Sequence, residues 1–122
     1  MSTPRTVTVP TSDLGTVIVP EPSWCAGHDE QPVDALVDLG HRSTEHPLGR
    51  PSDPVGIAFV SQYPHATNHL DRDLGLYVTQ TDIATTLTPE AVRELAADYE
   101  TAAAQLRRLA DWLHILKAGE GQ

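Results

Sequence analysis

The sequence has few residues of several kinds that mark common protein classes. Its 122 residues include one cysteine, one phenylalanine, two tryptophans and three tyrosines, so the core must consist mainly of aliphatic side chains. A single cysteine excludes a disulfide within the chain and favours a reducing compartment, so we expect a cytoplasmic protein. No apolar run approaches the ~18–20 residues of a membrane span, and the first residues lack the basic and apolar regions of a signal peptide.

Basic residues are also scarce. Eight Lys and Arg stand against 17 Asp and Glu, which gives a formal net charge of −9 and a pI near 4.8. This charge disfavours contact with a phosphate backbone, so we expect no direct binding to nucleic acid. It is compatible with a basic protein partner, with simple solubility, or with an acidic mimic of nucleic acid that blocks a DNA-binding protein.

The sequence motifs of several enzyme classes are missing. There is no P-loop, no Gly-rich dinucleotide fingerprint, no Gly-x-Ser-x-Gly and no EF-hand spacing. No catalytic residue is therefore assigned from a motif, and a protein without enzymatic activity is favoured.

Strand-forming residues dominate the first and middle parts of the chain. Two β-branched runs flank a turn-rich segment and predict a β-hairpin over residues 5–20. The apolar run at 55–62 suits a central strand, and a hairpin over residues 55–80 joins it to the next strand. Residues 35–39 fit a short strand or one turn of helix, of which we favour the strand. Residues 42–54, rich in proline, glycine and serine, predict a long loop.

The C-terminal part of the chain predicts one long helix over residues 88–117. Thr88 suits the N-cap, Pro89 the first helical position and Glu90 the positive end of the helix dipole. An unbroken heptad pattern follows, made of Val92, Leu95, Tyr99, Ala102, Leu106, Leu109, Leu113 and Leu116. Together with the strands, this helix predicts an α+β fold: a small, mostly antiparallel sheet of four to five strands and one helix, in a single domain of residues 1–122.

This helix would be longer than the sheet beneath it. Residues 89–117 span about 43 Å at 1.5 Å per residue, whereas strands of six to eight residues cross about 20–27 Å. Trp112 and Ile115 add apolar side chains outside the heptad pattern. We therefore expect the last turns to extend beyond the sheet and to bind a protein partner or a second copy of the chain, as a homodimer.

The only cysteine and three of the six histidines lie in one stretch, residues 24–47. Cys25, His28, His41 and His46 have the spacing C-x2-H-x12-H-x4-H, which is close to that of four-ligand zinc sites. A thiolate with imidazoles suits zinc in a tetrahedral field, so we predict that these four residues bind zinc.

The fourth ligand of this site is the least constrained. His46 precedes a proline in the loop-like segment, and Asp29, Asp38 or water could take its place. Without any metal, Trp24 and Cys25 would simply pack in the core, with ordinary surface histidines around them.

The role of the metal depends on how many residues bind it. If only Cys25, His28 and His41 bind, the open position could activate water, with Asp29 or Glu45 as the base of a metal-dependent hydrolase. Reading of DNA in the manner of a zinc finger is disfavoured, because no basic recognition helix lies between the ligand pairs. The short ligand spacing and the lack of catalytic companions favour a structural metal.

Several short motifs can be compared with known families. They are Trp24-Cys25 followed by His28, then His41-Arg42-Ser43, Gln62-Tyr63-Pro64 and Leu87-Thr88-Pro89-Glu90-Ala91-Val92 before a helix rich in Ala, Leu and Arg. This pattern resembles a family of small uncharacterised actinobacterial proteins, a domain of unknown function, from about Val7 to Leu116. The resemblance implies a bacterial cytoplasmic setting and no particular activity, and it supports Cys25, His28 and His41 more than His46.

The function that these observations favour is that of a small acidic interaction or regulatory protein. Zinc would fix the Cys/His segment, and the C-terminal helix would contact a protein partner or a second copy. The hydrolase and the acidic nucleic-acid mimic remain the alternatives.

Overall fold

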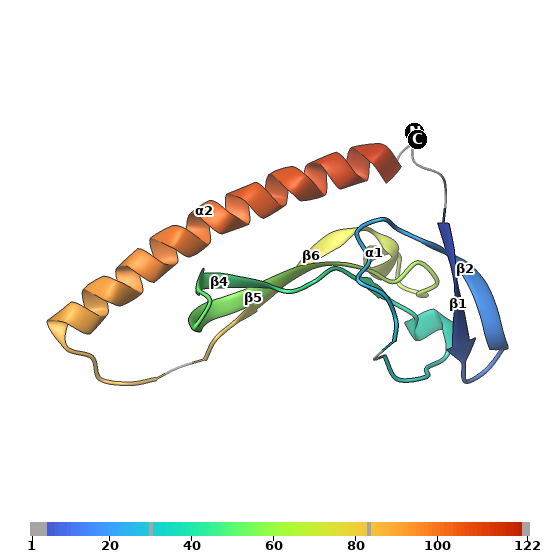
Figure 1. The fold of residues 1–122 in the computed structure, drawn as a ribbon, viewed down its shortest axis with the longest axis horizontal. Helices are drawn as coiled ribbons and strands as arrows, with labels where there is room; N and C mark the ends of the chain where they lie inside the picture. Colours follow the sequence, from blue (N-terminus) through green and yellow to red (C-terminus); the bar gives the residue numbers. More distant parts are fainter. Residues whose placement is uncertain (1–4, 30, 83, 121–122) are drawn as a thin grey trace. The chain divides into compact units, whose positions relative to one another are not determined.

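The computed structural model describes residues 5–29, 31–82 and 84–120 (Figure 1). Along the chain lie β1 (Arg5–Thr11), β2 (Gly15–Glu21), η1 (Leu36–Asp38), β3 (His41–Arg42), β4 (His46–Arg50), β5 (Asp53–Gln62), α1 (His69–Arg72), β6 (Gly75–Gln80) and α2 (Pro89–Glu120). They form two compact units, described separately below: residues 1–44 with 60–75, and residues 45–59 with 76–122. The single domain of residues 1–122 stays a prediction.

The strands form antiparallel sheets, and the α+β fold class is confirmed. β1 and β2 make a two-stranded sheet, while β3, β4 and β6 all pair with β5 in a four-stranded one. β5 is therefore central, as its apolar sequence predicts. The described residues contain six strands, where four to five were expected.

The hairpin of the first unit is the one that the sequence predicts. In its turn, Thr11 Oγ1 donates to the Gly15 carbonyl at 2.6 Å and accepts from the Leu14 amide at 3.0 Å. Gly15 has φ +68°, a conformation that glycine adopts without strain. The apolar side chains of the two strands meet a short segment that follows them, forming a core of Val7, Val9, Val17, Val19, Leu36 and Leu39.

Residues 36–38 form one helical turn, η1, so the helical alternative for this segment is correct and the strand favoured from the sequence is wrong. The Asp38 amide donates to the Ala35 carbonyl at 2.9 Å, and the Leu36 amide donates to Asp13 Oδ1 in the hairpin turn at 3.1 Å. The turn places Leu36 and Leu39, three residues apart, on one side against the hairpin valines. A strand would have pointed them to opposite faces.

The long loop predicted for residues 42–54 is also wrong, because β4 lies within it. β4 pairs antiparallel with β5, and Leu48 is buried in the second unit. The register shifts between Leu48 and Gly49, where Gly49 has φ +81° and donates its amide to Gln105 Oε1 at 2.7 Å. The glycine that made the segment look like a loop thus forms a bulge in a strand.

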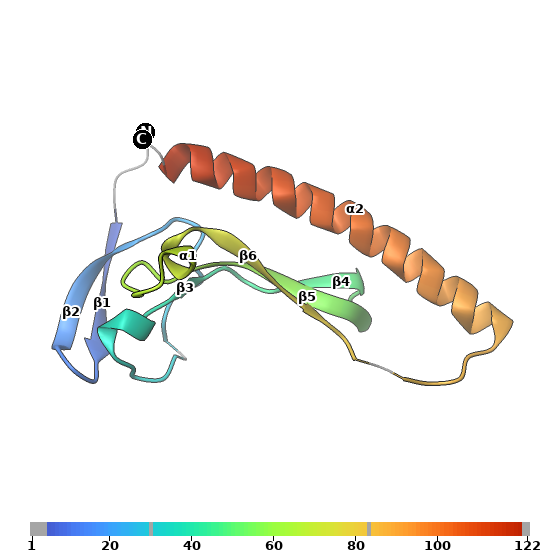
Figure 2. The ribbon, with the colours of Figure 1, turned by 180° about the vertical axis from the view of Figure 1, so that it is seen from behind.

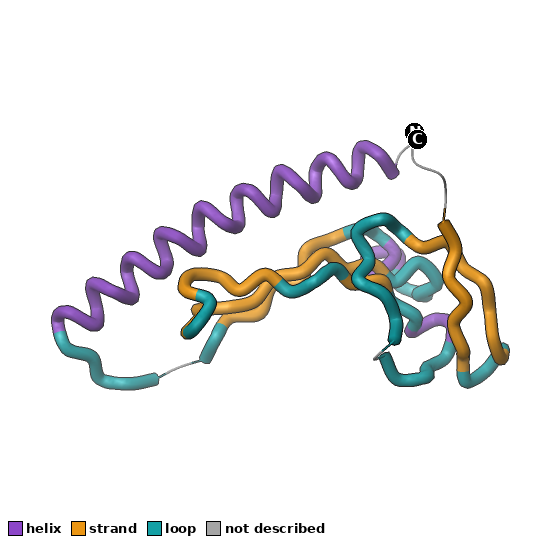
Figure 3. Tube along the Cα trace, in the orientation of Figure 1, coloured by secondary structure: helices purple, strands orange, loops and turns teal. Residues whose placement is uncertain are grey.

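In the second unit, α2 begins as predicted. Thr88 Oγ1 accepts from the Ala91 amide at 3.2 Å, as an N-cap does, and α2 then lies along β4 and β5 (Figures 1 and 2). The core between them consists of Leu48, Ala58, Ala102 and Leu109, with Val55, Leu76, Leu106 and Trp112 packed against it. Figure 3 shows this helix in purple along the strands β4 and β5 of the same unit. Within the described residues, no helix has the length and apolar content needed to cross a membrane.

The heptad pattern does not face the sheet along its whole length. Val92 and Tyr99 are 52% and 55% exposed, while Ala102 and Leu109 are buried. A straight α-helix rotates by about 20° per heptad relative to such a pattern, so its first turns carry these side chains away from the core. The same rotation brings Trp112 against the core, although we expected it to lie free for a partner. Ile115 stays 67% exposed.

Candidate metal centre

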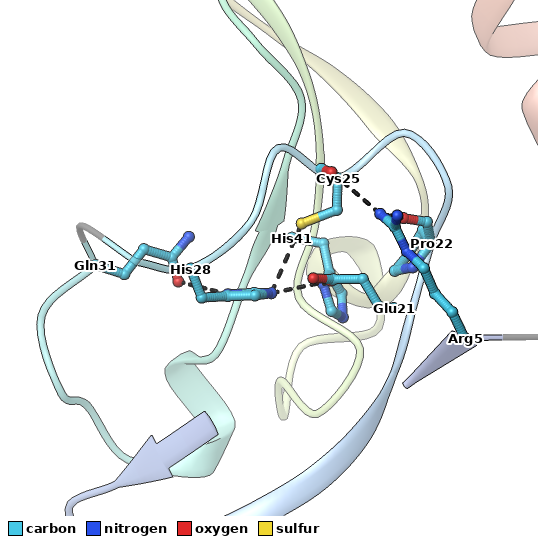
Figure 4. A network of polar contacts seen from close by, with 7 residues as sticks. All are labelled: Arg5, Glu21, Pro22, Cys25, His28, Gln31 and His41. Atoms are coloured by element: carbon cyan, nitrogen blue, oxygen red, sulfur yellow. Dashed lines mark hydrogen bonds and ion pairs between the residues drawn. The ribbon is translucent and has the colours of Figure 1, made fainter. Parts of the chain in front are cut away.

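Four side chains that can bind a metal meet in the first unit. Glu21, Cys25, His28 and His41 each offer one donor atom, and these atoms all lie within 4.8 Å of one another (Figure 4). The side chains of Glu21 and His28 are 7% exposed, that of His41 is 2% exposed, and Cys25 is buried. Buried charges and imidazoles of this kind need a partner, and a metal ion is one that satisfies all four.

The backbone explains why these four residues converge. Glu21 ends β2, Cys25 and His28 lie in the turn that follows, and His41 begins β3. The Cys25 amide donates to the Pro22 carbonyl at 3.1 Å, and Gly27, with φ +104°, lets the chain turn back.

Two contacts fix this turn to its neighbours. The Ala26 amide donates to the Arg42 carbonyl at 2.8 Å, which ties the turn to β3. The Arg5 guanidinium donates to the Pro22 carbonyl at 3.1 Å and the Cys25 carbonyl at 3.4 Å, which ties it to β1. The donor atoms are thus held by backbone contacts, and a metal need not assemble them.

The distances between donor atoms can be compared with those of a tetrahedral zinc site. Zinc–sulfur and zinc–nitrogen bonds of about 2.3 and 2.05 Å imply a sulfur–nitrogen separation of about 3.6 Å. Cys25 Sγ lies 3.6 Å from His28 Nε2. Glu21 Oε1 lies 3.0 Å from His28 Nε2 and 2.8 Å from His41 Nδ1, a few tenths of an ångström closer than coordination requires. The residues fit a metal if the carboxylate moves back by that amount.

The protons on His28 favour a cation at the centre of the cluster. Its Nδ1 lies 2.9 Å from Gln31 Oε1, an atom that can only accept, so Nδ1 carries a hydrogen. In the neutral ring Nε2 then has a free lone pair, which points at Cys25 Sγ and Glu21 Oε1 (Figure 4). Metal-binding histidines are commonly oriented in this way by an oxygen on the other ring nitrogen.

The buried Nδ1 atom of His41 also favours a cation at the centre of the cluster. This Nδ1 is 2.8 Å from Glu21 Oε1 but is not aligned for a hydrogen bond, and this buried atom has no such partner among the described residues. The ring is held edge-to-face by Trp24 and His28, at centroid distances of 6.3 and 5.2 Å. A buried nitrogen that is rigidly held beside a carboxylate and has no aligned hydrogen bond is an atom that a metal ion could satisfy.

The electrostatics of the cluster differ from residue to residue. Burial raises the pKa of the Cys25 thiol, and the nearby Glu21 carboxylate adds to this shift. Burial also acts to raise the pKa of Glu21, but the nearby side chains of His28, Cys25 and His41 outweigh it, so this pKa is lowered. Burial lowers the pKa of His41, against the attraction of Glu21. The neutral imidazole and the ionised carboxylate are both ready to bind a metal, whereas the thiol must first lose its proton.

The structure brings together three of the four residues that the sequence proposed. Cys25, His28 and His41 lie in the cluster, and Glu21 supplies its fourth donor atom. His46 lies on β4 in the second unit, where its ring packs edge-to-face on Trp112 at 5.8 Å. The hydrolase alternative requires a metal coordination position that is left open for water. The Glu21 carboxylate lies at that position in the cluster.

Glu21 was not considered from the sequence because it lies between two prolines at the end of a predicted strand. The sequence signal that could have identified Glu21 is its short distance along the chain from Cys25. Glu21 stands four residues before Cys25, and Pro22 turns the chain back so that the end of the strand and the cysteine meet. Asp29 and Asp38, which were considered, do not belong to the cluster.

Fold and site together define a small α+β protein with a buried cluster of mixed donors that could hold a metal ion. The chain belongs to the family described as a domain of unknown function (DUF6907), whose model matches residues 6–114. The resemblance to a family of unknown function is thereby confirmed. No curated protein and no solved structure matches the chain.

Proposed function

We propose that this protein is a small interaction module of the cytoplasm whose first unit is stabilised by zinc. The observation that carries the proposal is the meeting of four buried donor atoms from Glu21, Cys25, His28 and His41 within 4.8 Å. One thiolate, two imidazoles and one carboxylate form a donor set that zinc accepts in tetrahedral geometry. The single cysteine agrees with a reducing compartment, in which its thiol stays free to bind a metal.

A structural role for the metal agrees with the small core of the first unit. That core consists of six aliphatic side chains from the hairpin and η1. Small folds of this kind commonly need a metal or a disulfide in addition to their apolar contacts. An ion bound to Glu21, Cys25 and His41 would link the end of β2, the turn and the start of β3.

The interaction role rests on α2. Its core-facing side chains pack on β4 and β5, yet Val92, Tyr99 and Ile115 remain exposed on it. Exposed large apolar side chains on one helix favour a surface for protein contact. The net charge of −9 keeps this surface away from nucleic acid.

Elemental analysis of the purified full-length protein tests the metal. We expect one zinc per chain, and less than a tenth of that amount in the Cys25→Ser and His28→Ala variants. His69→Ala removes an exposed histidine of α1 and serves as the matched control, which should keep its zinc. Wild-type protein that binds no zinc when it is refolded with the metal would refute the proposal.

Thermal unfolding separates a structural metal from a catalytic one. A chelator should lower the midpoint by roughly 10 °C or more, because a metal at a thousand times its dissociation constant stabilises a small domain by about 4 kcal/mol. A zinc-loaded protein whose midpoint does not change with chelator would contradict the structural role while leaving the site intact.

A further inference from the structure

The exposed flank of α2 has a regular pattern of its own. Val92, Ala96, Tyr99 and Ala103 are spaced 4, 3 and 4 residues apart, which places them on one face of the helix. Val92 and Tyr99 are 52% and 55% exposed, Ala96 is exposed and Ala103 is half-buried. This face, which we call the 92–103 face, lies beside the stripe that packs on the sheet and is distinct from it.

We propose that the 92–103 face binds the same face of a second copy, with the two helices antiparallel. This inference rests on the proposed role of α2 as an interaction surface, and it names the partner and the residues. In a two-fold antiparallel pair, opposite positions have a constant sum of residue numbers. With a sum of 195, Val92 lies opposite Ala103 and Ala96 lies opposite Tyr99, so each large side chain meets a small one.

In the same register, the charged side chains beside this face meet opposite charges on the second copy. The flanking positions that meet across an antiparallel pair are Arg93 of one helix and Glu100 of the other, and symmetry makes the contact twice. Glu100 has only alanines at the positions three and four residues away, namely Ala96, Ala97, Ala103 and Ala104. Its own helix therefore offers it no partner at the spacing at which helical ion pairs form.

A second register must be distinguished from this one. Sliding one helix by one heptad, to a sum of 202, would bring like charges together, with Arg93 beside Arg107 and Glu100 beside its own copy. Sliding it by two heptads, to a sum of 209, would pair Glu100 with Arg107 and would place Tyr99 opposite Ala110. That register leaves Val92 facing a lysine, Lys117, and buries Leu106, which already packs on the core of its own chain. The register with Arg93 opposite Glu100 covers both of the large exposed side chains and is the one we propose.

The size of the contact sets the expected affinity. The pairing ends at residue 106, opposite Pro89, where the partner helix begins. A contact between two helical segments of this length lies at or below the ~1,200 Å² lower limit of stable interfaces. The dimer should therefore be weak, with a dissociation constant of the order of micromolar to tens of micromolar.

Charge reversal on the zinc-loaded full-length protein tests the pairing, with sedimentation velocity as the measurement. Arg93→Glu and Glu100→Arg should each raise the dimer dissociation constant roughly tenfold or more, because two attractions become two repulsions. An equimolar mixture of these two variants should dimerise again, since each reversed charge then meets its opposite in the other chain. The double variant R93E/E100R should likewise recover.

Controls keep a defect of folding apart from a defect of pairing. Arg108→Glu makes the same charge change on the opposite flank of α2 and should leave the dissociation constant within about twofold of the wild-type value. Recovery in the mixture cannot occur if the single variants are misfolded. Zinc content is measured on the same samples, so that failure of the metal site and failure of the dimer are seen separately.

Four outcomes would overturn the inference. One is a wild-type protein that carries zinc and stays monomeric at about 1 mM. Another is a dimer that Arg93→Glu does not weaken, and the third is a mixture that does not recover. A dimer weakened by Arg107→Glu and not by Arg93→Glu would also overturn it, in favour of the shifted register.

Discussion

Nδ1 of His41 and Oε1 of Glu21 lie 2.8 Å apart in a buried position without forming an aligned hydrogen bond. The same carboxylate oxygen lies 3.0 Å from Nε2 of His28. One carboxylate oxygen thus faces two ring nitrogens at the centre of the cluster. A divalent cation among these atoms would interact favourably with the Glu21 carboxylate, which is the donor of the cluster already ionised before the metal binds.

Replacing Glu21 by glutamine should weaken zinc binding while keeping the shape of the side chain. Glutamine retains one oxygen but loses the negative charge, so the affinity should fall by at least the ~10–100-fold that loss of a supporting partner costs. Asp29→Asn, a change of the same kind at an exposed residue close to the cluster, should have no effect. Competition with a chromophoric chelator measures both affinities. Equal affinities for wild type and Glu21→Gln would remove Glu21 from the site.

Gln31 should affect the metal only through His28. Its Oε1 accepts from His28 Nδ1 at 2.9 Å and so directs Nε2 to the cluster. Gln31→Ala should weaken zinc binding roughly tenfold and leave one zinc per chain at saturation. Gln80→Ala, an exposed glutamine of β6, is the control for loss of an amide. A Gln31→Ala protein that cannot be saturated would show that Gln31 does more than orient the ring.

The sequence predicted correctly those elements of the fold that depend on residues close together in the chain. The hairpin of β1 and β2 and the start of α2 were correct, because local signals decide them: β-branched runs for the first and the N-cap of Thr88 for the second. β4 was missed because its strand is made by pairing with β5 and by contact with α2, and neither is visible in a segment rich in proline and glycine. Tertiary contacts overrode the local composition.

The candidate site was predicted in part for a similar reason. Cys25 and His28 share one turn, so their spacing alone brings them together, and His41 follows at the start of β3. Glu21 reaches the cluster because Pro22 and the bond from Arg5 fold the end of β2 back on the turn. A search by cysteine and histidine spacing does not consider a carboxylate on a strand, so it chose His46 as the fourth residue.

Gly56 of β5 should tolerate no side chain. A Cβ at this position would collide with the Thr79 carbonyl of the neighbouring strand β6, and a backbone atom cannot move aside as a flexible side chain can. Gly56→Ala should lower the free energy of unfolding by about 1–3 kcal/mol, as overpacking does. Gly75→Ala is the matched control, because a Cβ there would meet no atom within 4 Å. Chemical denaturation of both variants measures the difference, and equal stabilities would contradict the close pairing of β5 and β6.

Zinc binding should release a proton from Cys25 at neutral pH. Burial raises the pKa of this thiol above its usual range, so at pH 7 the side chain is protonated in the folded chain. The thiolate is the form that binds the metal, and the proton must therefore leave when zinc enters. Because zinc displaces the thiol proton, the apparent affinity for zinc should rise with pH by up to about tenfold per pH unit below the thiol pKa.

Calorimetric titration in buffers of different ionisation enthalpy measures the protons released. We expect about one proton per zinc at pH 7.5 for the wild-type protein, and a slope near zero for Cys25→Ser with whatever zinc it still binds. Burial lowers the pKa of His41 below its usual range, so this ring should add no further proton at that pH. Zinc binding with no proton release at pH 7.5 would exclude Cys25 as a ligand, because a buried thiol of raised pKa has no other way to become the thiolate.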